Sequence, residues 1–150
     1  MAAVDLSRFV EPLQRDVGRA IAEIEAGRKR SHWIWYVLPQ IDGLGTSSTA
    51  RRCAIRSTAE ARAFLADAQL GADYRRVVAA VLDRVRAGTT LTELFGWPDD
   101  AKTVSSLTLF AGVADADDPL VDQVDEILAT DGRQRCAATV AFLSSCSGRS

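Results

Sequence analysis

The 150 residues are 47% hydrophobic and 25% charged, which is the composition of one compact soluble domain. The formal net charge of −2, from 18 Lys and Arg against 20 Asp and Glu, argues against a protein that binds nucleic acid over its whole surface, but it allows a local basic patch. No apolar stretch approaches the roughly 20 residues of a membrane span and no signal peptide precedes the first helix, so we expect a cytoplasmic protein with no membrane partner.

Two long amphipathic helices are predicted in the first 90 residues. Apolar side chains recur at steps of three and four over residues 5–26 and again over residues 70–86, and a glycine follows each run. Between them, residues 27–48 have the composition of a basic loop, a short buried helix or extended run, and a loop containing glycine and serine. Ser57 and Glu60 then have the spacing of a capping box, which predicts another helix to about residue 67.

Four more helix starts follow in the second half of the chain. They are marked by a second capping box at Thr90, by Pro98, by Asp118-Pro119 and by Asp131, from which the last helix should run to about residue 143. No stretch alternates as a strand would. We therefore expect an all-α protein of six to eight helices with no significant sheet, in a single domain over residues 1–150 whose last residues, from about 145, form a flexible tail.

Positive charge is concentrated between residues 26 and 56. This segment has six cations and one acid, a net charge of +5 in a chain whose total is −2. The cations are Arg28, Lys29, Arg30, Arg51, Arg52 and Arg56. Arginine offers planar, bidentate donors that suit phosphate, so the segment indicates a phosphate-binding site. The alternative is a solvated basic loop with no ligand.

Aromatic residues interleave with this basic segment. Trp33, Trp35 and Tyr36 lie within four positions, and an aromatic ring beside cations suits a ligand that combines a nucleobase with phosphate. Either Trp33 or Trp35 would stack on the base, unless both are core residues. We include Ser31 and Gln40 from the same segment among the candidate ligand-binding residues.

His32 is the only histidine in the chain. It excludes a multi-histidine metal centre, and the three cysteines form no C-x-x-C pair, so the sequence indicates no metal site and no cofactor. As the one side chain that ordinarily titrates near neutrality, His32 is a candidate general base or phosphate donor. The alternative is a packed histidine with a structural role.

A polar stripe runs along the helix that Pro98 opens. Asp99, Lys102, Thr103 and Ser106 fall on one side of a helix that is apolar nearly all round, and a buried polar stripe is either hydrogen-bonded or lines a pocket. In the pocket interpretation Ser106 binds the ligand, and Asp99 and Lys102 orient a ribose or act in N-glycosidic hydrolysis. The alternative is that Asp99 caps its own helix and pairs with Lys102.

The two lysines stand out because the other 16 cations of the chain are arginines. Lys29 lies in the basic segment and Lys102 in the polar stripe, which marks both as positions where a compact ammonium group matters.

Several of these motifs carry a family resemblance. Residues 27–40 (GRKRSHWIWYVLPQ) with Gly43-Leu44-Gly45, and residues 95–110 with Asp99-Asp100 and Lys102, resemble the domain-of-unknown-function 1810 family of small, mainly bacterial, all-helical proteins. The resemblance implies an all-helical fold. That family is in turn distantly similar to the YbiA-like proteins, which process ADP-ribose derivatives. This chain departs from the family pattern in having Cys53 where an aromatic residue is usual, and Ala101, Thr103 and Val104 where larger apolar or basic residues are usual.

Two functions from different classes follow. In the first, residues 28–33 and 99–106 form one pocket for a phosphorylated nucleotide or ADP-ribose-like ligand, and an enzyme of this kind would be a hydrolase of an N-glycosidic or ADP-ribose-type bond. In the second, the protein is a non-catalytic module whose basic segment, residues 28–56, contacts an acidic protein or a nucleic acid. The placement of Arg28 and His32 relative to Lys102 distinguishes these hypotheses.

Overall fold

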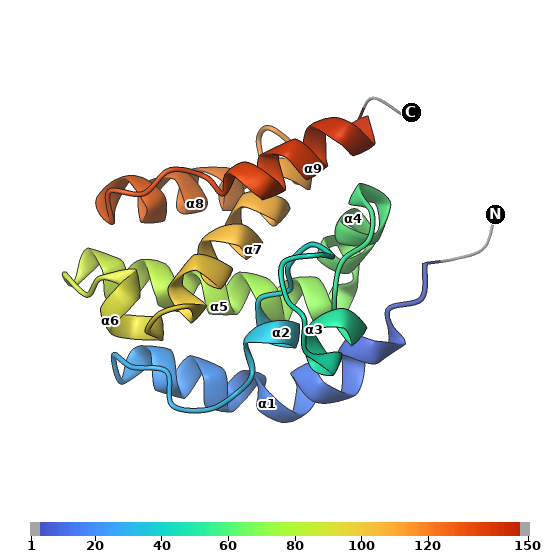
Figure 1. The fold of residues 1–150 in the computed structure, drawn as a ribbon. Coiled ribbons are helices and arrows are strands. Elements are labelled where there is room, and N and C mark those ends of the chain that lie inside the picture. The colour runs from blue at the N-terminus through green and yellow to red at the C-terminus, as the bar shows by residue number, and fades with distance from the viewer. Residues whose placement is uncertain (1–3, 148–150) are drawn as a thin grey trace.

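Two 19-residue helices, α1 (Ser7–Glu25) and α5 (Ala68–Arg86), pack against each other in the computed structural model, which describes residues 4–147, and α5 lies between α1 and α8 (Figure 1). Each has the apolar period that the sequence predicts. On α1 the buried side chains include Phe9, Leu13 and Ile24, and they face α5 and the core.

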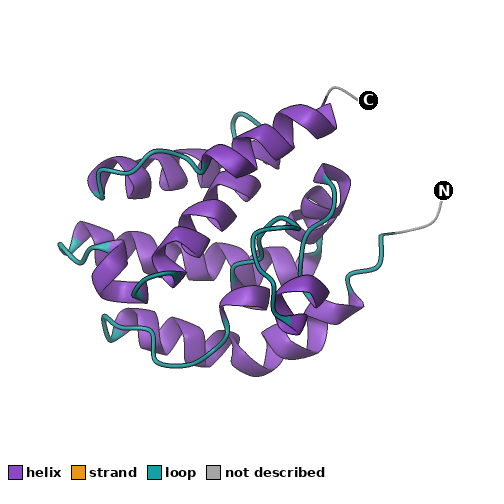
Figure 2. Cartoon of the chain, viewed as in Figure 1, coloured by secondary structure: helices purple, strands orange, loops and turns teal. Residues whose placement is uncertain are grey.

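Three short helices connect α1 to α5. They are α2 (Ile34–Val37), α3 (Ser48–Arg52) and α4 (Thr58–Ala66). The hydroxyl of Ser47 caps α3, and the hydroxyl of Ser57 caps α4 as the capping-box spacing predicts. Helix α3 was not predicted, because its five residues are too few to show a helical period. The parallel bridge between Ile41 and Ile55 holds the loop from α2 to α4 together, and residues 4–147 contain no strand (Figure 2).

The second half of the chain packs around one central helix. The elements are α6 (Leu91–Phe95), α7 (Asp99–Val113), α8 (Pro119–Thr130) and α9 (Ala137–Ser147). Helix α7 contacts α2, α4, α6, α8 and α9, and 11 of its 15 residues are buried. This burial agrees with its apolar sequence and requires its polar side chains to find partners inside the protein.

The aromatic part of the core joins four helices, one of which is α7. The ring centroid of Phe110 lies 4.4 Å from that of Tyr74 and 5.3 Å from that of Phe64, which in turn packs edge-on against Phe9. Because this cluster draws on α1, α4, α5 and α7, it fixes the relative positions of the helices that carry the sites described below.

Two predicted boundaries differ from the structure. Asp131 does not open the last helix, because it follows α8 and its carboxylate accepts hydrogen bonds from the Leu91 N–H and from Arg133, which places the start of α9 at Ala137. Residue 145, the approximate start of the predicted tail, lies within α9, which extends to Ser147, and residues 148–150 lie outside the described part. The all-α class is confirmed, with nine helices in residues 4–147. Across that range, no helix combines the length and the apolar character that a membrane crossing requires.

Candidate functional site

The carboxylate of Glu23, near the end of α1, holds the basic loop in place. It accepts hydrogen bonds from the backbone N–H groups of Arg30 and Ser31, at 2.7 and 2.9 Å, from the Ser31 hydroxyl at 2.6 Å, and from the Trp33 indole at 3.0 Å. Burial raises the pKa of Glu23, but these four donors outweigh it and hold the pKa at about 2. The polar groups of Ser31 and Trp33 are therefore engaged within the protein.

Both lysines of the chain converge on one carboxylate. The Nζ atom of Lys29 lies 2.8 Å from Oδ2 of Asp99, and Nζ of Lys102 lies 3.2 Å from Oδ1. Each ammonium also lies near a tryptophan ring, Lys29 at 5.1 Å from the centroid of Trp33 and Lys102 at 4.2 Å from that of Trp35. We call these five residues the lysine cluster. The basic segment and the polar stripe thus meet, and they meet as an ion-pair network.

The lysine cluster is packed rather than open. The Lys29 side chain is only 6% exposed, and Trp33 is 1% exposed and lies in the core. Gly45 contacts the outer atoms of the Trp35 ring so closely that a Cβ atom there would lie 2.8 Å from the ring and 2.5 Å from Cβ of Ala50. Gly45 of the Gly43-Leu44-Gly45 motif therefore makes room for Trp35.

The remaining polar residues predicted around this cluster have partners inside the protein. Ser106 is fully buried on α7 and hydrogen-bonds to the hydroxyl of Tyr74 at 3.1 Å, and Thr103 donates to the backbone carbonyl of Asp99. Gln40 is buried, and its amide lies 3.4 Å from the carbonyl of Leu38. Asp99 pairs with Lys102 as the alternative interpretation predicts, although its side chain makes no helix cap.

The exposed residues of the basic loop point to other surfaces. Arg28 lines a cavity of about 340 Å³ with Lys29, Thr92 and Glu93. Arg30 and His32 line a different cavity, beside α1. His32 therefore lies beside side chains of α1 and α2. Lys102 lines neither of the two cavities that His32 lines.

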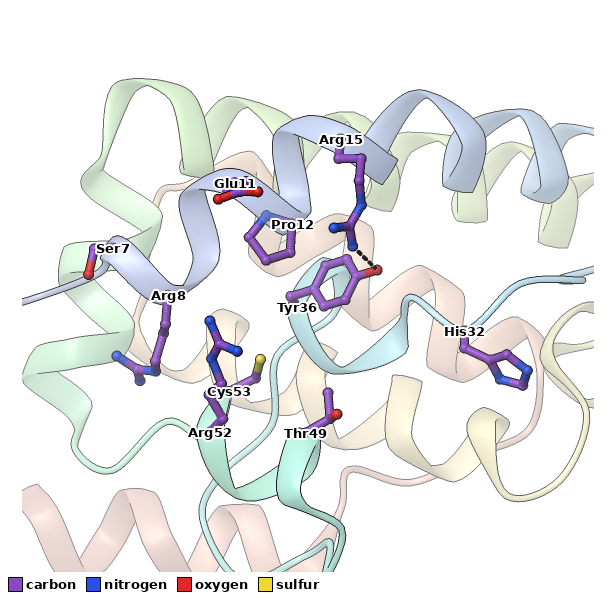
Figure 3. Close-up of a pocket in the computed structure, with 10 residues that line it drawn as sticks. All are labelled: Ser7, Arg8, Glu11, Pro12, Arg15, His32, Tyr36, Thr49, Arg52 and Cys53. Atoms are coloured by element: carbon purple, nitrogen blue, oxygen red, sulfur yellow. Dashed lines mark hydrogen bonds between the residues drawn. The ribbon is translucent and has the colours of Figure 1, made fainter.

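Two cavities that share a wall run beside α1, and together we call them the basic groove. The first, of about 470 Å³, lies between α1, α2 and α3, and the second, of about 450 Å³, lies between α1 and residues 30–33 (Figure 3 shows the first). Arg15, His32 and Tyr36 line both cavities. Arg8, Thr49 and Arg52 line only the first, and Arg19 and Arg30 line only the second.

The shared wall of the basic groove is a hydrogen-bonded triad. The Tyr36 hydroxyl donates to the buried carboxylate of Asp16, while Arg15 donates to the same carboxylate at 3.1 and 3.3 Å and to the Tyr36 oxygen at 3.4 Å. The bonds from Arg15 lower the pKa of Asp16, and burial together with Asp16 raises the pKa of Tyr36. The groove thus has a fixed wall that presents a guanidinium and a protonated phenol.

The two arginines found only in the first cavity differ in their availability. Arg8 forms an ion pair with Glu60 and donates to the backbone carbonyls of Asp5 and Ala54. Arg52 makes no side-chain hydrogen bond or ion pair within residues 4–147, and Figure 3 shows it extending from α3 toward α1. Arg52 is therefore the cation most available to a ligand in this cavity.

Comparison with known proteins identifies the family. The model of the family described as "Protein of unknown function (DUF1810)" matches residues 3–143. The chain belongs to the DUF1810 family. The crystal structure of the conserved hypothetical protein Rv1873 from Mycobacterium tuberculosis is similar, with 39% sequence identity and a TM-score of 0.84 over 93% of this chain and 96% of that one. No functionally curated protein matches.

The DUF1810 motifs of this chain divide between the two regions. Lys29, Trp33, Trp35, Asp99 and Lys102 belong to the lysine cluster, whereas Arg30, Ser31 and His32 line the second cavity of the basic groove together with Trp33. Their roles in binding or catalysis stay predictions, because neither comparison names an activity.

The sequence interpretation missed the contribution of α1 to the basic groove. Arg8, Arg15 and Arg19 are spaced by seven and four residues, which places all three on one face of the helix. This spacing is the sequence pattern that could have identified the α1 side of the groove.

Cys53 is a second residue whose place the sequence did not indicate. Its buried thiol lines the first cavity, and burial raises the pKa of that thiol.

Proposed function

We propose that this protein binds a phosphorylated, nucleotide-sized ligand, such as a nucleotide or an ADP-ribose derivative, in the basic groove. The observation that carries the proposal is the guanidinium of Arg52, which has no side-chain partner in residues 4–147 and faces the fixed wall of Arg15 and Tyr36 across a cavity of about 470 Å³. Small-molecule sites have volumes of about 300 to 1,000 Å³.

The chemistry of the groove favours recognition of phosphate. Arg52 offers a bidentate donor, and His32 and the Arg15 guanidinium add further donors on the shared wall. Tyr36 is only 7% exposed, so the groove presents little aromatic surface for a base to stack on. The phosphate is therefore the part of the ligand that this site recognises.

Binding without bond cleavage is the form of the function that we favour. Asp99, the carboxylate expected to act in N-glycosidic hydrolysis, is held by two lysines in the lysine cluster. Asp16 in the groove is occupied by Tyr36 and Arg15. Protein donors and cations already neutralise both carboxylates, which weakens each of them as a general base.

The test is ligand-dependent thermal stabilisation combined with calorimetric titration of inorganic phosphate, ADP and ADP-ribose. The melting temperature of the wild type should rise with ligand concentration, because the ligand binds only the folded state. Arg52→Ala should weaken binding about tenfold, the loss expected for one charge-assisted contact. Arg62→Ala is the matched control, since Arg62 is an exposed arginine with no side-chain partner in residues 4–147 and lines a separate cavity with Arg75.

Two results would overturn the proposal. One is the absence of any stabilisation or heat of binding at millimolar concentrations of all three compounds. The other is equal weakening by Arg52→Ala and Arg62→Ala, which would show that binding follows total charge and not the groove.

A further inference from the structure

We infer that the ligand of the basic groove carries two anionic groups, one bound near Arg52 in the first cavity and the other near Arg30 in the second. The inference rests on the proposed function and adds the chemical class of the ligand, a compound with a diphosphate or with two separate phosphates.

The shape of the groove is the first argument. Its two cavities have nearly equal volumes, about 470 and about 450 Å³, and they share Arg15, His32 and Tyr36. They therefore lie next to each other along α1, with residues of the hydrogen-bonded triad between them. A single phosphate would fill only a small part of either cavity.

The pairing of the charges is the second argument. Arg8 is paired with Glu60, and Arg15 and Arg19 share the carboxylate of Asp16. The two arginines that remain, Arg30 and Arg52, have no ion pair within the described part of the chain, and they line opposite ends of the groove. One monoanion could neutralise only one of them, whereas a ligand with two anionic groups could neutralise both.

The total charge of the groove agrees with this pairing. The residues that line the groove include five arginines but only two acids, Glu11 and Asp16. A third acid, Glu60, does not line the groove but neutralises Arg8. An excess of two positive charges remains. An anion of two or more negative charges is the ligand that this excess attracts.

The backbone around Arg30 is prepared for such a contact. The Glu23 carboxylate accepts from the Arg30 N–H, so the main chain at this position is fixed while the guanidinium stays exposed. His32 lines both cavities and is exposed, with no side-chain partner in residues 4–147, and Figure 3 shows its ring directed away from Arg52.

The experiment is calorimetric titration, at constant ionic strength, of inorganic phosphate, pyrophosphate and fructose 1,6-bisphosphate. Pyrophosphate tests adjacent anionic groups and the bisphosphate tests separated ones. The wild type should bind one of these two at least about tenfold more tightly than inorganic phosphate, the gain expected from a second charge-assisted contact.

Arg30→Ala should remove that advantage and leave the affinity for inorganic phosphate within about twofold, whereas Arg52→Ala should weaken every compound. Arg28→Ala is the matched control, because Arg28 is exposed on the same loop but lines a different cavity. All three side chains are exposed, so the melting temperatures without ligand should stay unchanged.

The possible failures are distinct. If phosphate binds through Arg52 but neither bis-anion binds more tightly, or if Arg30→Ala has no effect, the inference is wrong and the proposed function stands. If none of the compounds binds, both are wrong. If single-stranded oligonucleotides bind more tightly with increasing length, with steep salt dependence and equal loss in Arg28→Ala and Arg30→Ala, the surface is a nucleic-acid interface and the inference is wrong.

Discussion

The lysine cluster and the basic groove both combine cations with aromatic residues, but they differ in how the cations are paired. In the lysine cluster two ammonium groups share Asp99 and lie beside tryptophan rings, largely out of contact with solvent. In the basic groove Arg30 and Arg52 have no ion pair among the described residues. The charge of a paired, buried cation is already satisfied by protein groups, whereas an exposed cation with no partner can bind a ligand. The local charge excess in the sequence does not distinguish the two.

The sharpest test of this comparison is Asp99→Ala. It leaves the ammonium of Lys29, whose side chain is 6% exposed, without its counter-ion, so we expect the free energy of unfolding to fall by about 3 kcal/mol. Chemical denaturation measures the loss. Phosphate affinity in the groove should not change, because Asp99 does not line either cavity.

Asp117→Ala, at an exposed acid outside the helices, is the control for loss of a negative charge. The double variant Lys29→Met and Asp99→Leu should recover part of the stability, since Lys29, the more buried of the two lysines that pair with Asp99, is then no longer an unpaired charge. A phosphate affinity that falls with Asp99→Ala as it does with Arg52→Ala would contradict the division into two regions.

A smaller loss of stability is expected from Gly45→Ala. The added Cβ would lie 2.5 Å from Cβ of Ala50 and 2.8 Å from the Trp35 ring. Because these neighbours must move to make room, we expect the free energy of unfolding to fall by about 2 kcal/mol. Gly18→Ala is the matched control, because Gly18 lies inside α1 with no atom near the new methyl group. That control should stabilise the protein slightly through its higher helix propensity. Equal thermal melting of the two variants would show that Trp35 is loosely held.

The features that could be predicted from the sequence are the helices and their first residues. Apolar periodicity located α1 and α5, and capping-box spacing located the starts of α4 and α6, because these signals act over a few residues. The unusual use of lysine at Lys29 and Lys102 pointed to two positions that do meet at one carboxylate.

Pairing across the fold was not predictable in the same way. Sequence patterns do not distinguish Arg28 from Arg30 as phosphate-binding candidates, yet the two line different cavities. It also gave no reason to group Arg15 with Tyr36, which lie 21 residues apart and meet only because α2 packs on α1. Such contacts depend on how helices pack, and single-sequence patterns carry little information about packing.

The anchor of the basic loop should appear in the pH dependence of stability. The pKa of Glu23 is held at about 2, below its ordinary value of 4.5, so its contribution is present above pH 4.5 and is lost as the pH falls toward 2. Glu23→Gln should therefore lower the free energy of unfolding by about 1 kcal/mol at pH 7 and by much less near pH 2. Urea denaturation at several pH values measures the difference, with Glu25→Gln, an exposed acid near the end of α1, as the control. A difference that stays constant from pH 7 to pH 2 would show that the Glu23 charge does not hold the loop.

The smallest expected effect concerns the one acid in the basic groove that has no partner within residues 4–147. Glu11 lines the first cavity on the α1 wall, where its charge opposes an anion bound at Arg52. Glu11→Gln should raise the affinity for inorganic phosphate about twofold to threefold at low salt, and the gain should shrink as salt screens the repulsion. Calorimetric titration at two salt concentrations measures both. Glu25→Gln removes the same charge from the same helix but outside the lining of the groove, so it should leave the affinity unchanged. An equal gain in phosphate affinity in the two variants would contradict this prediction. It would mean that affinity depends on the net charge of α1 and not on the position of Glu11 in the groove.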